Sequence, residues 1–167
     1  MNAAFADDAE DRRVRTGARL FRALLAADLG LDEKANEDGS LTVAILTNNA
    51  ESAEATTSMI LGPEGNGRIQ AHAVRIVHLP SDELPDDPVA AIFIADRLDE
   101  QVRDRIVLWA IEHGVVSYSP FAGDVEAGVL AGISVEARVR PMINTRTLAA
   151  SGIQIKPFFL NVAKVTP

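Results

Sequence analysis

Two segments of the chain carry residue types that other proteins use for catalysis or nucleotide binding. "GISVE" places Ser134 where a G-x-S-x-G nucleophile elbow has its serine, but Glu136 stands at the position of the second glycine. "GPEGNGR", residues 62–68, has three glycines but lacks the Lys-Ser or Lys-Thr pair of a phosphate-binding loop, and it follows a predicted helix. The sequence therefore predicts neither a serine hydrolase nor a nucleotide enzyme, and Ser134 is expected to be an ordinary strand residue.

The histidines and carboxylates are also poorly spaced for metal binding or acid–base catalysis. His72 and His78 lie six residues apart on one predicted strand, and His113 ends a predicted helix, where positive charge favours the helix dipole. Asp86 and Asp87 are neighbours in a proline-rich loop, which favours solvated surface over a catalytic dyad. The chain has no cysteine, which excludes thiolate catalysis, disulfides and cysteine zinc sites. We expect no metal, no cofactor and no enzymatic activity.

Composition indicates one acidic globular domain. The 167 residues are enough for one sizeable hydrophobic core, built mainly from aliphatic side chains because aromatic residues make up only 5%. Sixteen basic and 24 acidic residues give a formal net charge of -8. Binding to nucleic acid depends on clustered Lys and Arg, so this balance argues against nucleic acid as a partner.

Hydrophobic periodicity predicts alternating helices and strands as far as residue 119. Val14, Ala18, Phe21, Leu25 and Leu29 recur at steps of four and three, as on one face of a helix over 8–29 that Gly30 would cap. Short apolar, β-branched runs predict buried strands. The elements expected next are a strand at 41–46, a helix at about 51–61, strands at 73–80 and 89–95, a helix from about Asp96 to Gly114, and a strand at 115–119.

The last third of the chain predicts a different arrangement. "GVLAGISV" and "VRPMIN" are typical of two short strands, followed by a helix at 145–151 that Gly152 stops. Pro157 opens a final helical turn or ends a strand. Apolar strands separated by helices are typical of a parallel sheet covered on both faces. We therefore expect an α/β fold over residues 8–167: a single three-layer domain with a mostly parallel central sheet flanked by helices, and a short strand pair near the C-terminus.

The carboxyl ends of the predicted strands are where an open parallel sheet binds its ligands. Asn48 and Asn49 follow the first strand, and Ser119 ends the strand at 115–119, with Phe121 and Asp124 shortly after it. These five residues offer short polar groups and one aromatic face, so we predict a small-molecule crevice there. Asn and Ser also cap helices at such positions, and that interpretation remains open.

The N-terminus resembles the end of an export signal. "AFA" at residues 4–6 has the small-x-small form of a signal-peptidase site, followed at once by acidic residues, but no apolar segment precedes it. Residues 1–7 are therefore either a signal-peptide remnant or a disordered start. The first alternative predicts a periplasmic protein.

The C-terminal segment has the opposite charge to the rest of the chain. From residue 137 onward there is no acidic side chain. The basic residues there are Arg138, Arg140, Arg146, Lys156 and Lys164. They form either one solvated face or a surface that meets an acidic partner.

The order of these segments resembles the YfiR-like family of bacterial periplasmic proteins. The resemblance rests on a glycine-rich turn followed by "ISV", "RVRPMIN", "SGIQI" and "FLNVAKV", and it covers roughly residues 14–165. Asn144, Gly152 and the final helix are its most specific points. Two departures stand out. The opening helix "RLFRALLAADLGL" lacks the aromatic, Trp-Pro-ended form, and a redox role does not carry over to a chain without cysteine.

The resemblance implies a non-enzymatic regulator that acts by protein–protein contact. Such proteins bind the periplasmic part of an inner-membrane diguanylate cyclase and hold it inactive until an outer-membrane-linked lipoprotein releases them, which tunes cyclic di-GMP and biofilm formation. The basic, apolar tail would then serve homodimerisation or partner docking. The candidate partner-binding residues are Arg138, Arg140, Asn144, Lys156 and Phe158.

The same tail also resembles one lobe of ABC-type periplasmic substrate-binding proteins. "GVLAGISV" and "MINTRTLAASGIQI" carry this second resemblance. Those proteins use two lobes to clamp a ligand, and this chain is about half that length. The alternative function is therefore a single-lobe module that binds or senses a small ligand.

Overall fold

The computed structural model describes the backbone of residues 2–62 and 66–167 and the side chains of residues 8–62 and 66–167. Residues 63–65 of the predicted glycine-rich loop at 62–68 lie outside the described residues. The helices are α1 (Asn2–Ala27), the short 3-10 helix η1 (Asp32–Lys34), α2 (Ala50–Leu61), α3 (Glu100–His113), α4 (Thr145–Ser151) and α5 (Pro157–Val162). The strands are β1 (Leu41–Leu46), β2 (Arg68–Ile69), β3 (His72–Leu79), β4 (Ala91–Ile94), β5 (Val116–Ser119), β6 (Ala131–Val135), β7 (Val139–Asn144) and β8 (Lys164–Thr166).

The strands form one sheet in the order β2-β3-β1-β4-β5-β6-β7-β8. Pairing is parallel from β3 through β6 and again between β7 and β8, while β2 with β3 and β6 with β7 pair antiparallel. The predicted α/β fold with a mostly parallel sheet and a C-terminal strand pair is therefore confirmed. β1, β4 and β5 lie inside the sheet and are buried on both faces, which explains their continuous apolar sequences.

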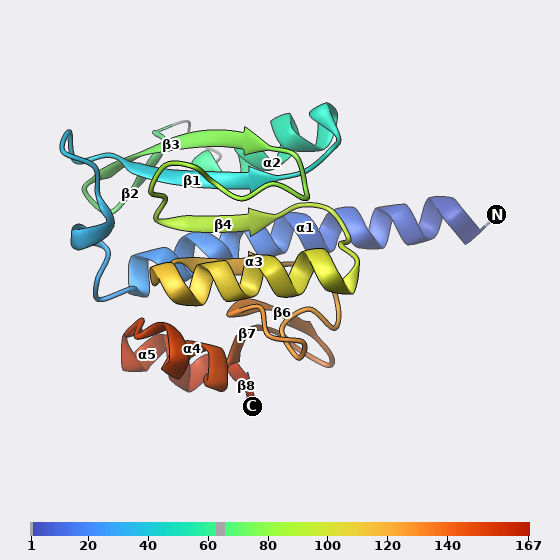
Figure 1. Ribbon diagram of the computed structural model, residues 1–167. Coiled ribbons are helices and arrows are strands. Elements are labelled where there is room, and N and C mark those ends of the chain that lie inside the picture. Colours follow the sequence, from blue (N-terminus) through green and yellow to red (C-terminus); the bar gives the residue numbers. More distant parts are fainter. Residues whose placement is uncertain (1, 63–65) are drawn as a thin grey trace.

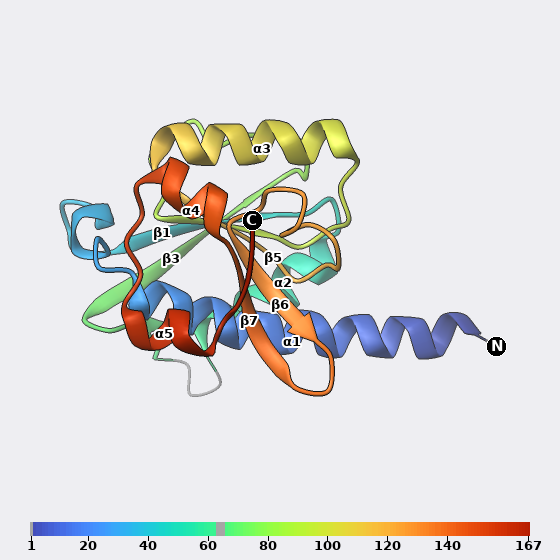
Figure 2. The same ribbon diagram turned by 90° about the horizontal axis from the view of Figure 1, so that it is seen from below.

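Helices cover both faces of this sheet, and Figure 2 shows α3 on one side with α1 and α2 on the other. On the α1 side, Phe21 packs edge-on against Phe93 and Tyr118, with ring centroids 5.3 Å away in each case. On the other side, Ile106 and Ala110 of α3 pack on the apolar residues of β1 and β4. These two layers make the hydrophobic core.

The first helix differs from its prediction at its C-terminal end. α1 ends at Ala27, and Asp28 forms an antiparallel bridge with Ile155. Leu29 is therefore exposed and is not part of the core stripe, while Gly30 donates its N–H to the Asp28 carboxylate instead of capping the helix. α1 begins at Asn2, so the backbone of residues 2–7 is helical, and the export-signal interpretation of those residues stays a prediction.

Side-chain caps set the helix starts. Asn49 caps α2 and Asn144 caps α4, each accepting a hydrogen bond from a backbone N–H three residues later. The helix predicted from Asp96 begins at Glu100, because Asp99 is its cap. Gly114 and Gly152 end α3 and α4 in the left-handed conformation, as predicted.

Candidate functional site

A cavity of about 830 Å³ lies at the carboxyl edge of the sheet, between α1 and α2. In Figure 1 the arrowheads of β1, β3 and β4 point toward the end of the molecule from which the first turns of α1 project. The cavity is lined by Glu10, Asp11 and Val14 of α1, by Glu51, Ser52, Ala55, Thr56 and Met59 of α2, and by Asn49, Ala95, Asp96, Arg97 and Phe121. Its place is the one predicted for a ligand in an open parallel sheet.

The strand order explains why a cavity forms at this point. β1 lies between β3 and β4, and α2 connects β1 to β3 on the face opposite α3. The loops that leave β1 and β4 therefore diverge, and Asn49 from the first loop and Ala95–Arg97 from the second line the cavity. A topological switch point of this kind opens a crevice between neighbouring strands.

Asp96, in the loop after β4, forms hydrogen bonds with the loop after β1. Its carboxylate accepts hydrogen bonds from the Thr47 hydroxyl at 2.6 Å and from the Asn48 N–H at 2.7 Å. Asn48 in turn exchanges hydrogen bonds with Ser81, in the loop that follows β3: its Nδ2 donates to the Ser81 hydroxyl at 2.6 Å, and its Oδ1 accepts from the Ser81 N–H at 3.0 Å. Asn48 therefore fixes the loop after β1 and does not line the cavity between α1 and α2.

Asn49 caps α2 and also lines the cavity. Its Oδ1 accepts the N–H of Ser52 at 3.0 Å, which caps α2. One side chain thus serves as a helix cap and as part of the cavity wall.

An ion pair and an aromatic ring close the cavity on the α1 side. The Arg97 Nε donates to the Glu10 carboxylate at 2.8 Å, joining α1 to the loop after β4. The guanidinium carbon of Arg97 lies 5.2 Å from the centroid of the Phe121 ring, within the range of a cation–π contact. Phe121 therefore belongs to the cavity, as predicted.

Ser119 and Asp124 do not line the cavity, which corrects their assignment as crevice residues. They are 0% and 7% exposed, and the Ser119 hydroxyl donates to the Asp124 carboxylate at 2.6 Å. The same hydroxyl oxygen accepts the N–H of Phe121 at 3.2 Å, and Arg103 lies 3.9 Å from Asp124. Their polar groups hold the loop that presents Phe121.

The candidate partner-binding residues divide into exposed and structural ones. Arg138 and Phe158 are exposed, whereas Asn144 is buried, caps α4 and donates its Nδ2 to the Val125 carbonyl at 2.8 Å. Asn144 therefore has no free surface to offer a partner, and its assignment is wrong. Lys156 is half-buried, and its Nζ donates to the Ala26 carbonyl at 3.2 Å.

The C-terminal basic charge is partly neutralised by a residue just before it. Glu136 pairs with Lys164 on β8 and lies 3.7 Å from Arg140. The Lys164 ammonium, by hydrogen bonding and by its charge, lowers the pKa of the Glu136 carboxyl. The exposed Arg138 thus differs from Arg140 and Lys164, which have an internal counter-charge.

The other candidates for chemistry have structural positions. Ser134 lies in β6 opposite Arg140, an ordinary strand position as predicted. The His72 ring lies between the Asp32 carboxylate at 2.7 Å and the Gly39 carbonyl at 2.8 Å. Across the described residues, no group of three His, Asp or Glu side chains is placed to hold a metal ion. No helix within them is long and apolar enough to cross a membrane.

The comparisons with known proteins give a fold and no family. Neither a family model nor a curated protein matches the chain. Among solved structures, the ABC domain from Streptococcus pneumonia in complex with L-Trp superposes with a TM-score of 0.55 over 92% of this chain, at 14% sequence identity. This chain spans 61% of that protein's length. At this identity the likeness shows the shared α/β fold alone.

Sequence reasoning missed the α1 wall of the cavity. Glu10, Asp11 and Val14 come from a helix that precedes the first strand, and Arg97 meets Glu10 across 87 positions of sequence. The only available signal was the position of Arg97 directly after a predicted strand end. No local pattern predicts which helix lies above that edge.

Proposed function

We propose that this chain is a small-ligand-binding module that takes an organic molecule into the cavity between α1 and α2. The observation that carries the proposal is the cavity itself: about 830 Å³, at the carboxyl edge of a parallel sheet, with both apolar and polar side chains in its lining. Ligand sites in proteins commonly have this size, this mixture of side chains and this place in the fold.

The solved structure with the same fold gives further support. The ABC domain that superposes on this chain is a complex with L-Trp. This chain spans about three fifths of that domain, so the proposal is of ligand binding by a single lobe. It is a proposal of binding without catalysis, because the polar pair nearest to a catalytic arrangement, Ser119 and Asp124, is buried within the protein.

A thermal-shift screen with amino acids and small aromatic compounds, beginning with L-Trp, tests the proposal. A native-state ligand at about 100 times its Kd stabilises by about 2.7 kcal/mol, which raises the Tm by roughly 5–10 °C in a chain of this size. Ala55 is exposed on α2 and lines the cavity, so Ala55→Trp should obstruct it and abolish the shift. Ala150→Trp, at an exposed position of α4, is the matched control and should keep the shift.

A screen with no shift, or a shift that survives Ala55→Trp and is lost in Ala150→Trp, would count against this cavity as the binding site. The Tm of both variants without ligand must first match that of the unmodified chain. This step separates obstruction of the cavity from damage to α2.

The regulator suggested by the YfiR-like resemblance is a second candidate, and one observation favours it. Phe158, Val162 and Val165 are 64%, 57% and 55% exposed on α5 and β8, an amount of apolar surface that suits a contact with another protein. A pull-down from detergent-solubilised membranes of the source organism, with the Phe158→Ser variant as control, tests this function. Recovery of a membrane cyclase with a periplasmic segment, lost in the variant, is the expected result; recovery of neither a cyclase nor any partner would reject it.

A further inference from the structure

The cavity has a strong excess of negative charge. Four carboxylates and one guanidinium line it: those of Glu10, Asp11, Glu51, Asp96 and Arg97. Arg97 is already engaged, because its Nε donates to Glu10 at 2.8 Å and its guanidinium lies over Phe121. Between the remaining carboxylates and the basic side chains of the described residues, no ion pair within 4 Å forms. Asp11, Glu51 and Asp96 therefore face the cavity without a cationic partner.

Asp96 is the carboxylate that the fold holds most firmly. Thr47 and the Asn48 N–H each occupy one of its two oxygens. Each carboxylate oxygen can accept two hydrogen bonds, so both retain capacity for a donor in the cavity. An acceptor fixed in this way loses little conformational freedom when a ligand binds, which favours affinity.

The rest of the lining is partly apolar, beside the uncharged polar side chains of Asn49, Ser52 and Thr56. Val14 of α1, Ala55 and Met59 of α2, and the Phe121 ring offer aliphatic and aromatic surface in the same cavity. A ligand that satisfies both the carboxylates and this apolar surface therefore combines an apolar body with a group that donates hydrogen bonds and carries positive charge. A metal ion or an inorganic cation would leave this apolar surface unused.

One feature of the cavity opposes this preference for a cation. The N-terminus of α2 points toward the cavity, and helix N-termini favour anions. Asn49 already accepts the Ser52 N–H, and Glu51 already places a carboxylate in the first turn of the helix. The field of this helix end is therefore largely offset by the protein itself, and an anionic ligand would meet uncompensated carboxylates.

We infer that the ligand of this cavity is an organic cation: an amine with an apolar body, whose ammonium group faces Asp11, Glu51 and Asp96. The inference rests on the proposed function and goes further, because it specifies the charge of the ligand. It makes Asp11 and Glu51 specificity-determining residues.

Two probes with the same indole body and opposite charge test the inference. Tryptamine carries an ammonium and indole-3-propionate a carboxylate on a two-carbon chain at neutral pH. The charges in the cavity are partly exposed and each contributes modestly, so we expect tryptamine to bind about tenfold more tightly in calorimetric titrations at low salt. The preference should shrink as salt is added, because salt screens exposed charges.

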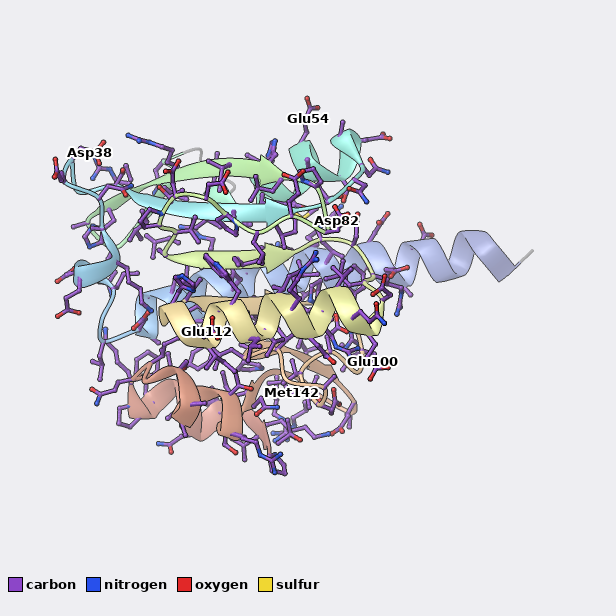
Figure 3. The ribbon with its side chains drawn as sticks, in the orientation of Figure 1. Asp38, Glu54, Asp82, Glu100, Glu112 and Met142 are labelled. Carbon is purple, nitrogen blue, oxygen red and sulfur yellow. The ribbon has the colours of Figure 1, made fainter. Side chains whose placement is uncertain are left out.

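A double variant and a matched control assign the preference to this cavity. Asp11→Asn with Glu51→Gln removes two carboxylates and should reduce the tryptamine preference to about twofold. Glu37→Gln with Glu112→Gln removes two exposed carboxylates elsewhere and should keep it. Figure 3 places Glu112 on α3, on the other face of the sheet, and shows the loop that carries Asp38, next to Glu37, at the opposite end of the sheet from the projecting turns of α1.

The possible results distinguish failure of the organic-cation inference from failure of the proposed ligand-binding function. Equal binding of both probes, or tighter binding of indole-3-propionate, with loss of binding in Ala55→Trp, would overturn the organic-cation inference and leave the ligand-binding module standing. A tryptamine preference that survives the double variant unchanged would also overturn it. Binding of neither probe at millimolar concentration, together with a screen without Tm shifts, would reject the proposed function itself.

Discussion

Among the glycines that the structure describes, Gly132 is the one where an added methyl group should destabilise the fold most. It lies in β6 opposite Ser119 of β5, and a Cβ at this position would come within 2.4 Å of the Ser119 carbonyl oxygen and 2.6 Å of a Val125 methyl group. A carbon and an oxygen in contact normally stay more than 3 Å apart. The carbonyl belongs to the backbone of a paired strand, so Gly132→Ala must push β5 and β6 apart, because no side chain can swing aside to relieve the contact.

Overpacking of a core costs about 1–3 kcal/mol, and an obstacle made of backbone puts Gly132→Ala at the upper end, about 3 kcal/mol. Such a loss of unfolding free energy lowers the Tm by roughly 6–12 °C in a chain of this size. Urea unfolding followed by circular dichroism measures it directly. Gly30→Ala is the control, since its Cβ would meet the end of the flexible Glu33 side chain at 3.2 Å and the Asp28 carboxylate at 3.5 Å, which is an ordinary contact distance.

Gly30→Ala should therefore change the unfolding free energy by less than about 0.5 kcal/mol. A loss below about 1 kcal/mol in Gly132→Ala would refute the reasoning, because it would mean that the two strands separate at little cost. Loss of probe binding should accompany the expected destabilisation, since Ser119 also fixes the loop that presents Phe121.

Three further predictions concern buried or paired polar groups. The Tyr118 hydroxyl is buried and has no hydrogen-bond partner among the described residues, so Tyr118→Phe should stabilise by about 1 kcal/mol in urea unfolding; a loss of similar size would show that the hydroxyl has a partner. Asn144→Ala removes a helix cap, leaves the buried Thr147 N–H without its acceptor and loses the hydrogen bond to the Val125 carbonyl, so it should cost about 2–4 kcal/mol in the same assay; a neutral result would contradict the structural role given to Asn144. The hydrogen bond to Asp32 raises the pKa of His72 above its ordinary value of 6.5, so the stability that His72 contributes is complete below pH 6.5 and lost as the pH rises through the raised pKa. The difference in unfolding free energy between the unmodified chain and His72→Gln should therefore be larger at about pH 5.5 than at about pH 8.5, and equal differences would contradict the pairing.

Local sequence patterns predicted the elements of this fold well where an element is long or carries its own boundary signal. The apolar run at 41–46 is β1 at the predicted residues, and Asn49, Gly114 and Gly152 mark helix ends as their residue types indicate. β2 and β8 were not predicted, because strands of two and three residues are too short to show the alternation of apolar and polar residues that marks a strand. Their pairing depends on neighbours that are distant in sequence.

The candidate site was predictable in place and only partly in composition. The rule for parallel sheets gave the edge at which the cavity lies, and Asn49 and Phe121 line that cavity. Ser119 and Asp124 are at the same edge, but they point into the protein because a serine and a carboxylate five residues apart satisfy each other. The direction of a polar side chain at a strand end depends on whether the protein supplies a partner, and no local pattern contains that information.

Whether a polar side chain has a partner within the protein also identifies the residues that can be changed without loss of the fold. Asp96, Asn48 and Asn49 all have hydrogen-bond partners within the protein, so their replacement would weaken the loops and any binding together. Asp11 and Glu51 are exposed, line the cavity and have no ion pair within the described residues, so the folded chain gains little from their charge beyond the modest interaction of Glu51 with the N-terminus of α2. Like charges held near one another oppose folding slightly, and a cationic ligand removes that cost on binding. The two carboxylates are thus the positions at which a change in ligand preference is separable from a change in stability.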